Sequence, residues 1–480
     1  MPIIAALQDA SAAPQPLGVG AVVLLFVVGS LFVVGWSRWV RPMNLAIGFA
    51  VTVAMWTLSY VAMLQPGLVA GELLFVAALA CVFVGGWVAG RRAPSEASGM
   101  SVGLVSATIN LMVVGAFLRD EQGGTHLRPI LYVAGLYAGS ALLGLLGDRL
   151  GRRGTSGRPL PAAATLLGAV ATANILVMIV LGGLVTSYEA GLAVPDWPNS
   201  FGHNMLLYPV SEMKGGIFYE HAHRLFGMLV GATTLAYATT AFRSGVPRAA
   251  RGLVVALVAL VVVQGILGGL RVTGNVTASM EASDLAPSTA MAIVHGMLGQ
   301  CVFAVAMLSA FACAGALDGV RGSAAGSRWM RSLPIAALAA LTMQLFLGAA
   351  MRHLQTAPTA DAGAKLPPWA LHGHVTMALI AFVLVFMAGR RSAKSVDARP
   401  IQALGKGISH AVGLQLVLGI AALVAVLVRR GVDVPWWEAI STTSHQALGA
   451  LLLAMTASLA VLAYRATLTG FSASSSASNA

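Results

Sequence analysis

The stretch AAATLLGAVATANILVMIVLGGLV, residues 162–185, carries no charged side chain. A helix of about 20 apolar residues crosses the roughly 30 Å hydrocarbon core of a membrane. Comparable apolar runs recur along the whole chain, and they lack the alternation of apolar and polar residues that marks barrel strands. Because only helices and closed barrels satisfy the backbone in lipid, the sequence predicts an all-α integral membrane protein.

Composition supports the same fold class. Of the 480 residues, 58% are hydrophobic and only 10% are charged, a balance that excludes an ordinary soluble protein. The 54 glycines suit close contacts between helices in a membrane bundle. We expect about thirteen transmembrane helices in total. Five lie near 17–36, 43–63, 68–89, 102–118 and 130–147, and eight lie near 162–185, 217–242, 252–272, 289–316, 334–352, 370–389, 404–428 and 439–463.

The formal net charge of +12 is concentrated in loops and the tail. With the N-terminus placed outside, most lysines and arginines fall on the inner side, for example Arg91, Arg92, Arg390 and Arg391. This bias predicts a multi-pass protein of the plasma membrane, with its N-terminus out and its C-terminus in. The positive excess therefore indicates topology, and we expect the lipid bilayer rather than nucleic acid as its partner.

The basic, glycine-rich loop GDRLGRRGTSGRPLP (147–161) is the clearest domain boundary. We predict an N-terminal region of five helices over residues 1–150, for which the sequence indicates no role. A first four-helix bundle should follow over 160–320 and a second over 330–466. Residues 467–480 are a low-complexity tail.

The eight later helices resemble two copies of one four-helix unit, a duplication common in membrane proteins. HAHRLFG (221–227) recurs as HGHVTMA (372–378), and HGMLG (295–299) recurs as HQALG (445–449). A Gln-x-x-x-Gly pattern also occurs three times, at Gln264–Gly268, Gln344–Gly348 and Gln415–Gly419. The repeat predicts two pseudo-symmetric bundles.

Histidine follows this repeat at one depth. His223, His295, His374 and His445 each lie four to six residues inside a helix from its outer end, roughly 6–9 Å at about 1.5 Å per residue. Polar groups at this depth are costly and usually functional. Two pairs favour bis-histidine ligation of haem iron in each bundle. The alternatives are hydrogen bonds to neighbouring helices, or zinc, for which two histidines would be too few.

Helix geometry separates the neighbouring histidines. Residues two apart point about 200° away from each other, so only one of His221 and His223 can face a haem, and likewise one of His372 and His374. The residue four positions later shares the ligand's face. It is small after all four chosen ligands, namely Gly227, Gly299, Ala378 and Gly449. We therefore expect His223, His295, His374 and His445 as axial ligands, with His221 and His372 in supporting or packing roles.

Glu220 lies three residues before His223, on the same face and one turn nearer the water. It is a candidate proton carrier or substrate-positioning group, although an acid near a helix start also has a purely structural interpretation. Arg224, Arg271 and Arg352 lie near outer helix ends, where they either pair with haem propionates or snorkel to the interface. His353 is a weaker candidate for the haem edge. The long outer loop at 185–202 is either a lid or a connector.

Together these motifs resemble the haem A synthases, membrane enzymes of cytochrome oxidase assembly. The resemblance covers about residues 162–465. It rests on GGLVTSYEAGLAVPDWP (182–198), on Glu-x-x-His-Arg at 220–224, on the Gln-x-x-x-Gly repeats, on Gly-Ala-x-x-Arg-His at 348–353 and on the later histidines. Unlike some bacterial members, the chain has no cysteine pair in its first outer loop. The first five helices have no recognised counterpart.

The resemblance implies oxidation of the C8 methyl group of haem O to a formyl group, giving haem A. It implies a catalytic role for Glu220, a substrate site at His223 and His295, and a haem b at His374 and His445 that passes electrons. It also implies a haem O-producing farnesyltransferase and an electron donor as partners, and leaves open a homo-oligomer. The main alternative is a di-haem b-type cytochrome that transfers electrons without modifying haem, and a transporter is a third class.

Overall fold

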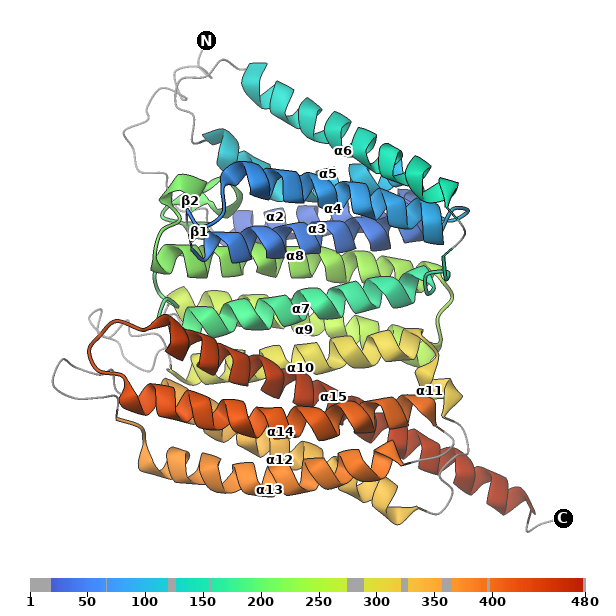
Figure 1. The fold of residues 1–480 in the computed structure, drawn as a ribbon, viewed down its shortest axis with the longest axis vertical. Helices are drawn as coiled ribbons and strands as arrows, with labels where there is room; N and C mark the ends of the chain where they lie inside the picture. The colour runs from blue at the N-terminus through green and yellow to red at the C-terminus, as the bar shows by residue number, and fades with distance from the viewer. Residues whose placement is uncertain are drawn as a thin grey trace. The chain divides into compact units, whose positions relative to one another are not determined.

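The computed structural model describes residues 19–65, 67–119, 127–154, 157–273, 289–320, 327–355, 365–394 and 398–477. Each of the thirteen expected spans coincides with a long helix, so the predicted all-α fold class is confirmed (Figure 1). These helices are α2 (Val19–Trp39), α3 (Pro42–Met63), α4 (Gly71–Arg92), α5 (Gly99–Arg119), α6 (Leu127–Arg153), α7 (Ala163–Ser187), α8 (Gly216–Arg243), α9 (Arg248–Thr273), α10 (Thr289–Cys313), α12 (Arg328–His353), α13 (Pro368–Ala393), α14 (Arg399–Val428) and α15 (Trp436–Ala477).

Eleven of these helices, counted over the described residues, are long and apolar enough to cross a membrane. The remaining elements are short: α11 (Ala316–Gly319), the strands β1 (Asn199–Ser200) and β2 (His203–Asn204), and the 3-10 turns η1 (Met205–Leu207) and η2 (Val210–Glu212). Helix α15 continues to Ala477, so the tail expected from residue 467 begins as helix; residues 478–480 lie outside the described part.

The chain divides into two compact units. The first comprises residues 1–159, 190–236 and 272–275, and the second comprises 160–189, 237–271 and 276–480. One division falls inside the glycine-rich loop at 147–161. The first unit also contains the outer loop between α7 and α8 and most of α8 itself. This division does not separate the two predicted four-helix bundles, so the boundary between them stays a prediction.

The first unit joins α3, α4, α5 and α6 through small and polar residues. A Cβ added at Gly86 on α4 would collide with the carbonyl of Gly144 on α6, and one at Gly103 on α5 would collide with that of Ser140. Backbones at such contacts approach closely, as expected where no hydrophobic effect drives helices together in lipid. The helices pack tightly because the glycines carry no side chain at the crossing points.

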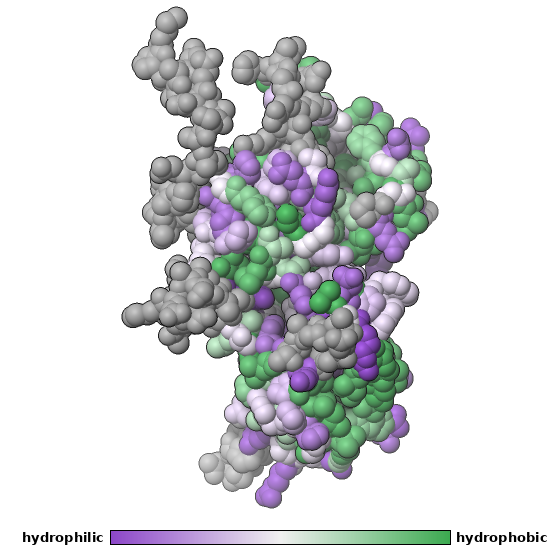
Figure 2. Space-filling model, turned by 90° about the vertical axis from the view of Figure 1, so that its left-hand side faces the viewer, coloured by the Kyte–Doolittle hydropathy of each residue, from purple (hydrophilic) through white to green (hydrophobic). Residues whose placement is uncertain are grey.

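In the second unit, α15 contacts α7, α10, α12 and α14, while α13 contacts α12 and α14 (Figure 1). The outward face of α14 carries an apolar stripe at helical spacing, formed by Leu414, Val417, Ile420, Val424 and Leu427. Such a stripe suits contact with lipid rather than with water. Figure 2 views the side of the molecule that bears β1 and β2, where hydrophilic and hydrophobic residues are interspersed and hydrophobic residues gather toward one margin.

Candidate functional site

Two of the predicted iron ligands meet inside the second unit. The rings of His374 on α13 and His445 on α15 lie with their centres 6.3 Å apart and their planes at 78°. A metal–imidazole bond is about 2 Å long and a ring nitrogen lies about 1 Å from its ring centre, so one shared metal ion sets two ring centres about 6 Å apart. The observed spacing therefore fits a metal ion held between both rings.

Hydrogen bonds orient the His374 ring. Its Nδ1 lies 3.2 Å from the backbone carbonyl oxygen of Gln344, and its Nε2 lies 3.1 Å from the Gln344 side-chain nitrogen. Donation by Nδ1–H to the carbonyl leaves the lone pair on Nε2, which accepts from the Gln344 amide in this structure and is the nitrogen that iron would take. Two imidazoles at this spacing are a donor set that suits iron.

Glutamine and histidine pack reciprocally against glycine in the repeated unit. A Cβ added at Gly419 on α14 would lie 2.8 Å from the His445 ring, and one at Gly449 on α15 would lie 3.0 Å from the Gln415 amide nitrogen. That amide nitrogen also lies 3.1 Å from His445 Nδ1 and donates to the His445 carbonyl at 3.0 Å. Each glycine therefore makes room for a side chain of the neighbouring helix.

The same arrangement recurs between α9 and α10. Gln264 donates to the carbonyl of His295 at 2.8 Å, and a Cβ at Gly268 would lie 3.1 Å from the His295 ring. In sequence, the Gln-x-x-x-Gly pattern is visible only as a repeat. The structure adds that it supports the histidine of the following helix, a role that sequence reasoning missed because the two residues lie about 30 positions apart.

In the first unit, His221 and His223 have different surroundings. His221 is fully buried, its Nδ1 lies 3.0 Å from the Ser200 hydroxyl, and its ring is 4.9 Å from that of Tyr208. It faces the outer loop, whereas His223 is only partly buried. His372 on α13 is exposed. His223 belongs to the first unit and His295 to the second, so their pairing stays a prediction from the repeat.

Glu220 is buried and both of its carboxylate oxygens are engaged. Oε2 accepts from the backbone N–H of Val194 at 2.8 Å, and Oε1 accepts from Arg224 at 2.7 Å, one turn further along α8. Charge-assisted hydrogen bonds of this kind are short and strong. Glu220 therefore has one fixed orientation and connects α8 to the outer loop.

Arg224 extends this connection. Its guanidinium donates to the backbone carbonyls of Val194, Asp196 and Asn199 at 2.6–2.9 Å. Asp196 in turn accepts from the backbone N–H groups of Phe201 and Gly202, next to the β1–β2 turn. The loop at 190–204 is thus folded, and hydrogen bonds from the buried Glu220–Arg224 pair hold it to α8.

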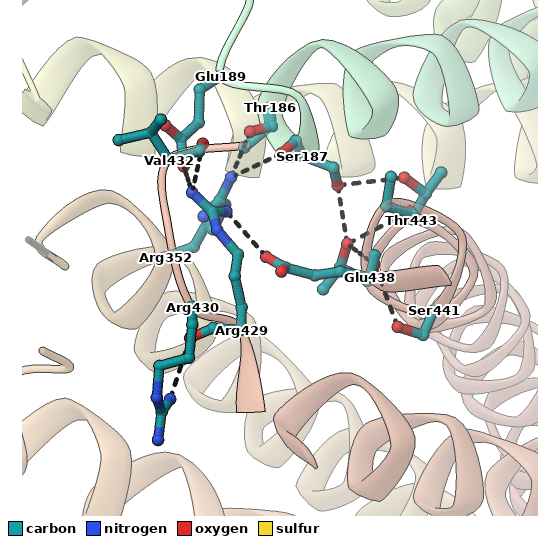
Figure 3. Close-up of polar contacts among 12 residues, drawn as sticks. Thr186, Ser187, Glu189, Arg352, Arg429, Arg430, Val432, Glu438, Ser441 and Thr443 are labelled. Atoms are coloured by element: carbon teal, nitrogen blue, oxygen red, sulfur yellow. Dashed lines mark hydrogen bonds and ion pairs between the residues drawn. The ribbon is translucent and has the colours of Figure 1, made fainter. Parts of the chain in front are cut away.

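The second unit carries a different charged cluster where α7 and α14 end and α15 begins, drawn in Figure 3. Arg429, just after α14, lies 3.1 Å from Glu438 on α15 and 3.1 Å from Glu189, just after α7. The Arg429 and Glu438 side chains are each only 3% exposed. Arg352 on α12 donates to the carbonyls of Thr186 and Ser187, where a cation also complements the C-terminal end of α7.

Two further predicted residues lie within the second unit. Arg271 is partly buried near the C-terminal end of α9, and His353 ends α12 within electrostatic range of Arg271 and His295. Propionate binding by Arg224, Arg271 and Arg352 stays a prediction. Arg429 and Glu438 were not anticipated from sequence; the only signal was a pair of charges flanking an outer helix boundary.

The fold defines a multi-pass helical membrane protein, and its second unit brings the His374 and His445 rings together. A family model described as cytochrome oxidase assembly protein (COX15-CtaA) matches residues 165–457, and the chain belongs to this family. Helices α2 to α6 precede the matched region.

The curated relatives point the same way. The chain is 30% identical over 192 residues to the "Heme A synthase" of one strain of Methylorubrum extorquens, covering 37% of this chain and 49% of that protein. It is 31% identical over 182 residues to the protein of the same name from a second strain of that species, covering 35% and 46%. It is 28% identical over 164 residues to the "Heme A synthase COX15" of Homo sapiens, covering 28% and 39%. The chain thus spans no more than about half the length of these relatives.

Proposed function

We propose that this protein is a haem A synthase-like oxidoreductase, which converts the C8 methyl group of haem O to a formyl group. The observation that carries the proposal is the His374–His445 pair, at the spacing of two ligands on one metal ion, inside the segment that matches the family. The curated relatives are named haem A synthases, which supports haem A as the product; haem O as the substrate is proposed from the resemblance of the motifs.

In this proposal His374 and His445 hold a haem b, which supplies electron transfer when bound. The backbone carbonyl of Gln344 would orient the His374 ring through Nδ1, and the Gln415 amide holds the His445 ring at Nδ1 and its backbone at the carbonyl. His223 and His295 are assigned to haem O on the sequence repeat. Arg271 and Arg352 are offered to the propionates because a guanidinium pairs well with carboxylates.

Glu220 has the proposed catalytic role. Its two hydrogen bonds fix the carboxylate one turn from His223, where it would position the substrate or carry a proton. Arg224 is the positioning residue, because it holds both Glu220 and the loop that covers it. The loop would exclude water from this end of α8.

The proposed setting rests on the distribution of lysine and arginine in the sequence and on the resemblance. The protein would lie in the plasma membrane with its haem sites toward the outer side. A farnesyltransferase that makes haem O would supply the substrate, and a separate electron donor would serve the haem b.

A di-haem b-type cytochrome is the second candidate, because electron transfer needs only the four histidines. The buried Glu220–Arg224 pair and the folded loop favour the enzyme, since electron transfer alone requires neither. Pigment extraction separates the two. Cells that make haem O and express this protein should yield haem A or a hydroxylated intermediate. Unchanged haem O beside a folded, haem b-containing protein would contradict the enzyme.

A further inference from the structure

The five N-terminal helices lie outside the region that matches the family, yet α3 packs directly on α8 within the first unit. We propose that α3 braces the segment of α8 that carries Glu220 and His223, and so gives the N-terminal region a positioning role. This inference rests on the proposed function for its catalytic consequence, but its structural part can be tested without it.

An aromatic cluster forms the contact, and it consists of Trp56 and Tyr60 on α3 and Phe218 and Phe226 on α8. The Tyr60 and Phe218 rings are stacked with centres 5.1 Å apart, and Trp56 meets Phe226 edge-on at 5.6 Å. Tyr60 also meets Phe226 edge-on at 6.0 Å. All four side chains are buried. Stacked and edge-on aromatic pairs at these distances have defined geometry, so the contact fixes both position and rotation.

The two phenylalanines of the cluster flank Glu220 and His223 along α8. Phe218 precedes Glu220 by two positions and Phe226 follows His223 by three. At about 100° per residue, Phe218 lies about 140° around the helix from His223 and about 160° from Glu220, whereas Phe226 lies about 60° from His223 and about 120° from Glu220. The aromatic cluster therefore packs on the side of α8 away from Glu220 and extends next to His223, so it sets the rotation of the helix that carries both residues.

Buried hydrogen bonds fix α3 itself against α5. Trp56 Nε1 donates to Asn110 at 2.8 Å, the Thr52 hydroxyl donates to Ser106 at 3.0 Å, and the Ser98 backbone N–H donates to Asn44 at 2.9 Å. Polar bonds between apolar helices set their rotation, because any other rotation leaves these groups unpaired in lipid. These three hydrogen bonds therefore hold Trp56 and Tyr60 against α8 in one orientation.

The N-terminal region also supports the outer loop. Helix α5 contacts η1, and Tyr208 after η1 is buried against His221. The loop that binds Glu220 and Arg224 is therefore held from two sides, by α8 and by the N-terminal helices. Both elements that orient Glu220 depend on contacts with a region that the family match does not include.

The test compares the Trp56→Leu/Tyr60→Leu double variant with a Trp39→Leu control. Trp39 lies on α2 and is 91% exposed, so its loss removes an aromatic ring without touching α8. Hydrogen exchange is measured over residues 190–227 in the full-length, detergent-purified protein. We expect exchange at the start of α8 and in the loop to rise at least about 10-fold in the double variant, because these amides open locally when packing is lost. The control should match the wild type.

Haem O conversion gives the second readout. Misplacement of a catalytic group by about 1 Å costs up to about 10²-fold in rate, so conversion should fall about 10- to 100-fold while the haem b spectrum is unchanged. If the double variant does not accumulate, Phe226→Leu removes the contact from the α8 side and should give the same exchange pattern.

Exchange and conversion equal to those of the Trp39→Leu control would overturn the brace. Raised exchange in the double variant together with no conversion by the wild type would support the brace and contradict the proposed function. The two failures are therefore distinguishable.

Discussion

Each unit holds a buried glutamate paired with arginine near the start of a histidine-bearing helix, but the two pairs are built differently. Glu220 and Arg224 lie on the same helix, and their remaining bonds go to the backbone of the outer loop. Glu438 and Arg429 belong to different segments and join the ends of α14 and α15. The first pair holds a loop over one helix, whereas the second fastens helices to each other.

The hydrogen bonding of the two carboxylates also differs. Both oxygens of Glu220 accept hydrogen bonds, whereas Oε2 of Glu438 has no hydrogen-bond partner among the described residues. The difference fits a division of labour, in which a covered end would handle substrate and a clamped end would hold a permanent cofactor.

The largest expected loss of activity is at Glu220, where the loop at 190–204 covers α8. Glu220→Gln should lower haem O conversion by about 10²- to 10⁴-fold, the usual contribution of a positioned acid or base. Haem b content should stay at the wild-type level. Chromatography of extracted haems and the reduced spectrum give the two measurements.

Arg224→Met is the matched variant for Glu220. It removes the same ion pair but retains the carboxylate, so conversion should fall less than in Glu220→Gln. An equal loss in both variants would mean that Glu220 acts only by holding the loop, and the catalytic assignment would then be wrong.

At the clamped end, Arg429→Met should mainly reduce stability. Removing one partner of a buried ion pair leaves Glu438 with an uncompensated charge, which costs about 3–5 kcal/mol in known cases. The exposed neighbour Arg430 is the control, because surface substitutions usually stay within about 0.5 kcal/mol. Denaturation in detergent measures both. Equal stability of the Arg429 and Arg430 variants would contradict a stabilising role for the Arg429–Glu438 ion pair.

A smaller effect is expected at the glutamines. Gln415→Leu should weaken haem b binding about 10- to 100-fold, because groups that orient a metal ligand contribute this much to affinity. Gln344→Leu is the matched comparison and should have a smaller effect, because the backbone carbonyl that orients His374 is retained. Titration of the haem-depleted protein with haem b measures both. Wild-type affinity in Gln415→Leu would show that Gln415 packs against His445 without orienting it.

Much of this architecture was predictable because transmembrane helices are specified locally. The apolar run at 162–185 gave α7 to within two residues, and each expected span corresponds to a helix. The separation of His221 from His223 followed from helix geometry, and the structure places His221 against Ser200 in the loop. Features with a period or a fixed spacing were therefore accessible from sequence.

Long-range contacts were not accessible in this way. Arg429 meets Glu189 across 240 positions, and Trp56 meets Phe226 across the predicted domain boundary. Nothing in the local pattern distinguishes Trp56 from an aromatic residue facing lipid, since both occur in apolar helices. The role of Gly449 also differs from that expected, because the side chain nearest to its Cβ position is Gln415 on the neighbouring helix.

The most direct test of the division of labour is the haem b content of histidine variants purified from cells that make no haem O. His374→Ala and His445→Ala should lose the bis-histidine haem b spectrum, whereas His223→Ala and His295→Ala should retain it. Loss of haem b from the His223 and His295 variants, with retention in the His374 and His445 variants, would contradict the assignment of cofactor and substrate to the two ends.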